Sequence, residues 1–153
     1  MSSLPVMVVG GGIAGVQAAL DLAEAGRRVV LVERSPSIGG KMAALDKNFP
    51  TLDCSICIEA PKLSEVAENR NIEVLSNAEV AAVVRRDDAS FRVTVRRHGS
   101  LVSDECTRCG LCSEACSIVL PNEFDAGMAS RKAIYTRFRR PSRAPTSSPS
   151  RTA

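Results

Sequence analysis

The sequence predicts an α/β fold: a βαβ unit with an antiparallel hairpin, then a small segment organised by cysteines, then a tail without a core. Three observations support this prediction. Two short apolar runs flank a glycine-rich turn and a helical pattern, a later run alternates apolar and polar residues, and four cysteines fall within eleven residues. A chain of 153 residues can bury one ordinary core, with room for a small satellite.

The βαβ unit comes first. Residues 6–9 read VMVV, a run typical of a strand buried on both faces. Residues 14–25 place apolar side chains at helical spacing, and Gly26 follows where a C-terminal cap belongs. Residues 29–32, VVLV, predict a second buried strand. A strand, a helix and a strand within about thirty residues form a unit whose two strands run parallel.

Further elements follow with weaker patterns. Residues 58–68 predict a helix, although Pro61 limits where it can begin. Residues 72–75 suggest a third strand. Residues 80–84 and 91–95, separated by a polar stretch, predict a hairpin, and its second arm has the period of a half-exposed antiparallel strand.

Composition narrows the class of protein. Hydrophobic residues make up 44% of the chain and charged residues 24%, as in a globular protein. Aromatic residues, at 3%, are too few for a platform that stacks nucleic-acid bases. The apolar stretch at residues 4–9 is too short for a signal peptide or a membrane span. Six cysteines in such a chain predict reduced thiols with metal or redox roles, and a cytoplasmic location.

The net charge of +3 arises in the tail. Residues 137–153 contain five Arg and no acidic residue, so residues 1–136 carry −2. Because the tail is rich in Pro, Ser and Arg, we expect it to be disordered. The body offers no basic face, so no nucleic-acid partner is predicted.

A glycine loop carries the most specific motif of the first half. It fits G-x-G-x-x-G between a predicted strand and a predicted helix, the context that gives this pattern meaning. The first glycine permits a tight turn, the second lets the backbone approach a pyrophosphate, and the third lets helix and strand pack closely. The start of the helix then faces the phosphates. The loop consists of Gly10, Gly11, Gly12, Ile13, Ala14 and Gly15.

An acidic residue completes this dinucleotide site. Glu33 ends the second strand eighteen residues after Gly15, where its carboxylate can accept hydrogen bonds from the adenosine ribose and repel a 2′-phosphate. The spacing from Glu33 to the pair Gly39-Gly40 resembles the E-x5-G-G pattern of flavoproteins such as glutathione and thioredoxin reductases. That resemblance implies a Rossmann-like FAD-binding domain with Gly40 and Lys41 near the FAD, Arg34 beside Glu33 in the same site, and the hairpin as part of a β-meander.

The second half contains a cysteine cluster with the spacing C-x2-C-x2-C-x3-C. Three thiolates from one tight loop can reach three irons of a cubane, so this spacing favours a 4Fe–4S cluster. Zinc is the competing metal, but its structural sites usually join two C-x2-C pairs across a longer gap. Ser117 stands where ferredoxins have Pro, and no cysteine follows, so the cluster's fourth ligand stays open. The predicted ligands are Cys106, Cys109, Cys112 and Cys116.

A C-x-x-C pair at Cys54 and Cys57 allows three interpretations. It can be a redox dithiol that exchanges electrons with the flavin, because this spacing closes readily into a disulfide. It can supply ligands to a cluster, or it can be two small, partly buried residues. The sequence names no catalytic acid or base.

Several segments together resemble the A-type subunit of heterodisulfide reductase and its bacterial relatives, over roughly residues 5–136. They are residues 8–15, residues 33–40, FPTLDCSIC at 49–57, PNEFD at 121–125 and RKAIY at 131–135. The resemblance implies a cytoplasmic FAD and 4Fe–4S electron-transfer oxidoreductase with other iron–sulfur subunits as partners. It divides the chain into an incomplete FAD-binding domain (1–100), a ferredoxin-like 4Fe–4S segment (101–136) and the tail (137–153).

Members of that family run several hundred residues further, which leads to a hypothesis about the tail. Where they commonly read Pro-Phe-Pro-Gln-Ala-Val-Pro, this chain has RFRRPSR at residues 137–143, the product of a one-base shift in such codons. We therefore expect an N-terminal fragment ended by a frameshift, which the underlying DNA tests. The alternative function is a ferredoxin-like or nucleotide-binding module without flavin turnover.

Overall fold

The computed structural model describes residues 4–99, 102, 105–107 and 109–135, which fall into two compact units that divide between residues 99 and 102. The predicted disorder of residues 137–153 lies outside the described residues. With η for a short 3-10 helix, the elements in chain order are β1 (Val6–Val9), α1 (Ile13–Glu24), β2 (Val29–Val32), η1 (Met42–Ala44), β3 (Lys47–Asn48), β4 (Asp53–Cys54), α2 (Ser55–Glu68), β5 (Ile72–Leu75), β6 (Ala78–Arg85), β7 (Phe91–Arg97), α3 (Leu111–Ala115), β8 (Val119–Pro121), η2 (Glu123–Asp125) and β9 (Ser130–Lys132).

The first unit is built on a parallel sheet of three strands in the order β1-β2-β5. Val8 lies opposite Leu31, and Leu31 lies opposite Val74, so the central strand β2 has an apolar partner on each side. The predicted βαβ unit and the third strand are confirmed. Because all three strands are parallel, their carboxyl ends meet at one edge of the sheet, where open α/β sheets bind ligands.

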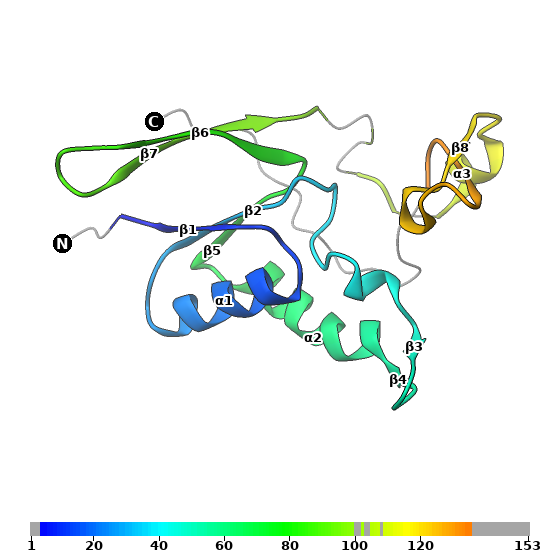
Figure 1. The fold of residues 1–153 in the computed structure, drawn as a ribbon, viewed down its shortest axis with the longest axis horizontal. Coiled ribbons are helices and arrows are strands. Elements are labelled where there is room, and N and C mark those ends of the chain that lie inside the picture. The colour runs from blue at the N-terminus through cyan, green and yellow to red at the C-terminus, as the bar shows by residue number, and fades with distance from the viewer. Residues whose placement is uncertain (1–3, 100–101, 103–104, 108, 136–153) are drawn as a thin grey trace. The chain divides into compact units, whose positions relative to one another are not determined.

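Two helices, α1 and α2, pack under the same face of this sheet (Figure 1). Side chains from the sheet, both helices and the η1 segment form the core. The helices therefore bury apolar surface that strands of four residues could not bury alone. The fully buried side chains include Val16, Ala19, Val29, Leu31, Leu63 and Val66. In the described residues, no helix is both long enough and apolar enough to cross a membrane.

The predicted start of helix α2 is wrong. It begins at Ser55 rather than near residue 58, and it continues through Pro61. A proline inside a helix removes one backbone hydrogen bond, which is why it argued for a later start. Strand and cap contacts secure the start instead: Cys54 pairs with Lys47 in the two-stranded β3–β4 ladder and serves as the N-cap of α2.

The predicted hairpin is present as β6 and β7, which pair antiparallel from Ala78 opposite Arg97 to Arg85 opposite Phe91. A β-bulge interrupts the register between Val80 and Ala82. Within residues 4–99 this sheet has two strands, so the hairpin is present without further strands of the expected β-meander.

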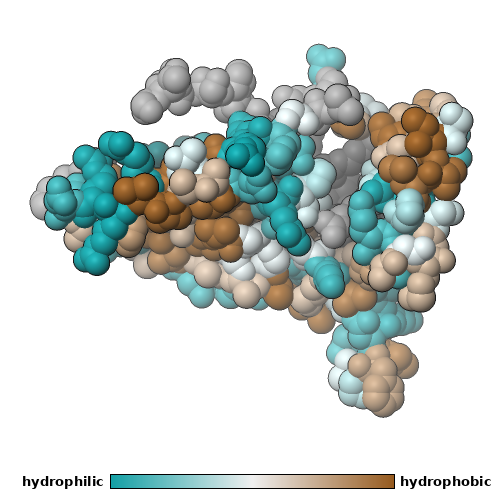
Figure 2. All heavy atoms as spheres, turned by 45° about the horizontal axis from the view of Figure 1, so that its top comes forward, coloured by the Kyte–Doolittle hydropathy of each residue, from teal (hydrophilic) through white to brown (hydrophobic). Residues whose placement is uncertain are grey.

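The second unit has secondary structure but little core. Its strands β8 and β9 pair antiparallel, and α3 spans five residues. None of its described residues is buried, and apolar side chains lie at its surface (Figure 2). A unit of this size without a buried core usually needs a metal or disulfides to hold its fold. The exposed apolar residues include Leu111, Ile118, Val119, Phe124 and Met128.

Candidate cofactor site

The glycine loop joins β1 to α1 and is shaped by two of its glycines. Gly10 has a φ of +103°, a conformation that favours glycine, and its N–H donates to the Val32 carbonyl at 2.8 Å. A Cβ on Gly15 would lie 1.8 Å from the Gly10 carbonyl oxygen. The first turn of α1 therefore packs directly on the loop, and only glycine fits there.

Gly12 differs from Gly15 because it faces open space. It is the N-cap of α1 with ordinary extended backbone (φ −77°, ψ −178°), and a Cβ placed on it would meet no atom within 4 Å. As a glycine it offers the helix no side-chain cap. The first N–H groups of α1, beginning at Ile13 and Ala14, thus keep their capacity to bind an anion. This open cradle fits a phosphate group.

Glu33 has partners that the sequence did not predict. Its side chain is 8% exposed; the Gly11 N–H donates to its Oε2 and the Ser35 N–H to its Oε1, both at 2.7 Å. The carboxylate thus ties the end of β2 to the glycine loop. Each oxygen keeps a further lone pair, so a ribose hydroxyl can still donate to it.

The Gly39-Gly40 turn packs against the same loop from the other side. The Gly39 N–H donates to the Gly11 carbonyl at 2.6 Å, and a Cβ on Gly40 would lie 3.0 Å from the Gly12 Cα. Both glycines have positive φ, +110° and +58°. The residue Gly11 is therefore held through both its N–H and its carbonyl, and the two predicted halves of the site are brought together.

Arg34 and Lys41 are the two basic residues predicted for this site. Both are exposed, Arg34 next to Glu33 and Lys41 directly after Gly40. Guanidinium and ammonium groups pair with phosphate oxygens, so both side-chain types suit a pyrophosphate.

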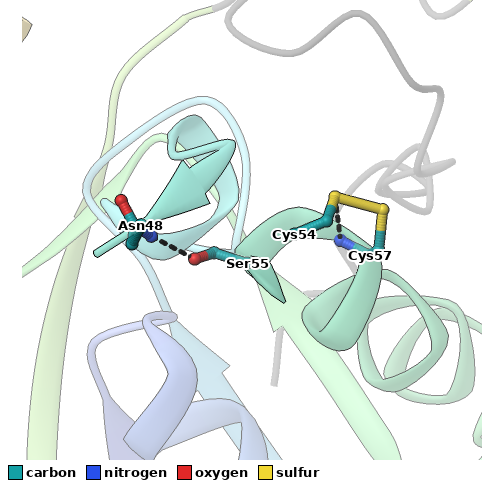
Figure 3. Close-up of a disulfide and its surroundings, with 4 residues drawn as sticks. All are labelled: Asn48, Cys54, Ser55 and Cys57. Carbon is teal, nitrogen blue, oxygen red and sulfur yellow. Dashed lines mark hydrogen bonds between the residues drawn. A yellow bond between two sulfur atoms is a disulfide. The ribbon is translucent and has the colours of Figure 1, made fainter. Parts of the chain in front are cut away.

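Cys54 and Cys57 are joined by a disulfide at the start of α2 (Figure 3), so the prediction of reduced thiols is wrong for this pair. Their Cα atoms are 5.1 Å apart, within the range in which disulfides form. Cys57 is exposed and Cys54 half-buried. The pair lies at the end of the β3–β4 ladder, and Asn48 donates a hydrogen bond to Ser55 between the two cysteines (Figure 3).

Glu59 was missed in the sequence analysis. It lies on the buried face of α2 with Ser55, Leu63 and Val66, is 0% exposed, and neither carboxylate oxygen has a hydrogen-bond partner. Burial raises the pKa of Glu59 to about 7, against a smaller opposing effect of Lys62. Its position in the 3.6-residue repeat with Leu63 and Val66 is the signal that could have identified it.

The four predicted cluster ligands lie in the second unit as free thiols. Cys106, Cys109 and Cys112 are exposed and Cys116 is half-buried. Hydrogen bonds with the backbone of Ile134, and to a smaller extent of Ile118, hold the pKa of the Cys116 thiol below its usual value. The donor set suits an iron–sulfur cluster in its chemistry. Among the described residues, no three or more His, Cys, Asp or Glu side chains lie close enough together to hold a metal ion, so the structure does not bring the four predicted ligands together.

Comparisons with known proteins identify the fold of the first unit. The FAD dependent oxidoreductase family matches residues 5–48. The L-proline dehydrogenase of P. horikoshii shares the fold, with a TM-score of 0.53 and 26% identity over 61% of this chain and 19% of that one. The first unit therefore has the Rossmann-like fold of FAD-dependent oxidoreductases.

Several relatives match most of the chain. The chain is 53% identical to an A-type iron-sulfur subunit of the CoB--CoM heterodisulfide reductase of Methanopyrus kandleri, over 86% of this chain and 20% of the relative. It is 52% identical to a protein of Archaeoglobus profundus that is named as similar to the A-type subunit of heterodisulfide reductase. That match covers 87% of this chain and 19% of the relative. A third relative is the A-type subunit of the H(2):CoB-CoM heterodisulfide,ferredoxin reductase of Methanothermobacter marburgensis. It is 48% identical over 86% of this chain and 20% of the relative. The chain spans about a fifth of the length of these proteins.

Proposed function

We propose that this chain, which over most of its length is a relative of the A-type subunit of heterodisulfide reductase, is part of a flavin-dependent electron-transfer oxidoreductase and binds the adenosine-diphosphate half of FAD at its glycine loop. The observation that carries this proposal is how Gly12 differs from Gly15 and Gly40. Gly15 and Gly40 pack against backbone atoms, whereas Gly12 faces open space at the start of a helix. That open space is where a pyrophosphate would replace solvent.

Each residue of the site has a role in this proposal. The backbone from Gly12 to Ala14 binds the pyrophosphate, Glu33 accepts from the ribose, and Arg34 and Lys41 add positive charge. Bound FAD would supply the ability to take two electrons and release them singly. The chain's own contribution is to hold and orient the dinucleotide, because Glu33 and Gly39 fix Gly11 before any ligand binds.

The second part of the proposal concerns the second unit. Cys106, Cys109, Cys112 and Cys116 would hold a 4Fe–4S cluster that accepts one electron at a time. Support comes from four free thiols in a unit in which no described residue is buried, since a cluster can replace the missing core. Electron exchange with other iron–sulfur subunits, in the cytoplasm, completes this proposal.

Ligand competition tests the flavin site. The purified chain is titrated with FAD, ADP, FMN and NADP+ by calorimetry. We expect FAD and ADP to compete for one site, FMN not to bind, and NADP+ to bind weakly because its 2′-phosphate meets the Glu33 carboxylate. Binding of FMN in place of ADP would contradict the proposal. Binding of FAD without its reduction by any electron donor would favour a nucleotide-binding module without flavin turnover.

Anaerobic reconstitution tests the cluster. Iron and sulfide should produce the broad visible absorption of an iron–sulfur protein and protect the amides of residues 105–135 from hydrogen exchange. The matched variant Cys109→Ser should lose both effects, whereas Ser113→Ala, in the adjoining helix α3, should retain them. Protection by zinc alone, with no cluster formed from iron and sulfide, would contradict this part of the proposal.

A further inference from the structure

We propose that the Cys54–Cys57 disulfide is a thiol–disulfide exchange site that reacts with dithiols at the Cys57 sulfur. The proposed flavin site does not assign these two residues, and the proposal does not depend on it. The sequence left three interpretations of this pair open. Thiol–disulfide exchange is the one that requires the two cysteines to form a disulfide, as they do here. Four other cysteines of the described residues are free thiols, so the bonded state is selective for this pair.

The backbone around Cys54 is fixed before any reaction. Cys54 pairs with Lys47 across the β3–β4 ladder, and the next residue, Ser55, donates its N–H to the Asp46 carbonyl at 3.1 Å. Asn48 donates to the Ser55 hydroxyl as well. These contacts do not involve the bond between the two sulfurs, so the segment can keep its conformation when that bond opens.

The two sulfurs are not equivalent. Cys57 is exposed and open to an incoming thiolate, whereas Cys54 is half-buried at the N-cap of a helix of 14 residues. The Cys57 N–H donates to the Cys54 Sγ at 3.3 Å (Figure 3). A thiolate on Cys54 would keep that hydrogen bond and lie at the positive end of the helix. Access therefore favours attack on Cys57, and charge stabilisation favours Cys54 as the leaving group.

The reaction balances with a dithiol as the reductant. A thiolate of the dithiol attacks the Cys57 sulfur, a new sulfur–sulfur bond forms, and the Cys54–Cys57 bond breaks to leave a Cys54 thiolate. The second thiol of the reductant, as a thiolate, attacks its own sulfur in this mixed disulfide and releases Cys57. Two electrons pass to the protein, Cys54 and Cys57 take up two protons in total, and the reductant leaves as a disulfide.

Trapping the mixed disulfide tests the assignment on the unmodified chain. The protein is treated briefly with reduced glutathione, quenched with iodoacetamide, and digested. Tandem mass spectrometry then locates glutathione and the alkyl group in the peptide that contains both cysteines. We expect glutathione on Cys57 and the alkyl group on Cys54 to exceed the reverse arrangement roughly tenfold, because access and leaving-group stability act in the same direction. Dithiothreitol without denaturant should reduce the pair fully, and its oxidised form should close it again.

Three results would overturn the proposal. Equal trapping at the two sulfurs, or an excess on Cys54, would remove the assigned roles. A disulfide that resists dithiothreitol in the folded protein would be structural. Protection of both reduced cysteines from alkylation after addition of iron and sulfide would make them cluster ligands. The free thiols Cys106 and Cys112, read in the same digests, give the reference for alkylation of an exposed cysteine.

Discussion

Glu59 gives a prediction whose size follows from the structure. Its carboxyl group is fully buried without a hydrogen-bond partner, and burial raises its pKa from 4.5 to about 7. In the unfolded chain the group ionises at its ordinary pKa. Because the folded state holds the proton more tightly, stability is fully present below pH 4.5 and is lost as the pH rises to about 7.

The size of the stability change follows from the difference between the folded and unfolded pKa values of Glu59, which is about 2.5 pH units. Each pH unit corresponds to about 1.4 kcal/mol. The free energy of unfolding should therefore fall by about 3 kcal/mol between pH 4.5 and 8 because of this one group. Replacing Glu59 by Gln keeps the shape of the side chain and removes its charge. The variant should lack this pH-dependent loss, while every other titrating group contributes equally to both proteins.

Urea unfolding of the chain and of Glu59→Gln, followed by circular dichroism from pH 4.5 to 8, measures this difference. The gap between the two unfolding free energies should widen by about 3 kcal/mol in favour of the variant as the pH rises. Lys62, one turn further along α2, acts in the opposite direction, so Lys62→Met should widen the loss. If the two curves run parallel within about 0.5 kcal/mol over this range, Glu59 is not a buried, unpaired acid.

Two further substitutions test how the glycine loop is held. Gly15→Ala would place a Cβ 1.8 Å from the Gly10 carbonyl oxygen, so urea unfolding should show a loss of about 3 kcal/mol or more, or no folded protein; a stable variant would contradict this packing. Glu33→Gln can satisfy only one of the N–H groups of Gly11 and Ser35, which should cost about 2 kcal/mol without any ligand present. Unchanged stability of that variant would leave ribose binding as the sole role of Glu33.

The framework of the first unit could be predicted because its signals are local. Each signal depends on a few neighbouring residues: the apolar runs of β1 and β2, the glycine loop that follows β1, and the alternation of apolar and polar residues in β7. The start of α2 could not be predicted in this way. It is set by the pairing of Cys54 with Lys47 across a loop, which outweighs the tendency of Pro61 to end a helix.

The site was predictable in its residues but not in its internal contacts. The motif identified Gly12 and Glu33 by type and spacing. The hydrogen bond from Gly11 to Glu33 joins residues 22 apart in sequence, and it depends on how the sheet places the end of β2 beside the loop. The burial of Glu59 was predictable from its place in the helical repeat with Leu63 and Val66, but the lack of a hydrogen-bond partner for its carboxylate was not.

Our central claim is that the space in front of Gly12 receives the pyrophosphate of FAD. The most direct measurement compares FAD binding by the unmodified chain, Gly12→Ala and Gly99→Ala, each checked for unchanged urea unfolding. Neither glycine has an atom within 4 Å of the added methyl group or a φ that disfavours alanine, so both variants should fold normally. We predict that Gly12→Ala weakens FAD binding at least roughly tenfold, about 1.4 kcal/mol, while Gly99→Ala leaves it unchanged. Equal FAD affinity of Gly12→Ala and the unmodified chain would contradict the claim.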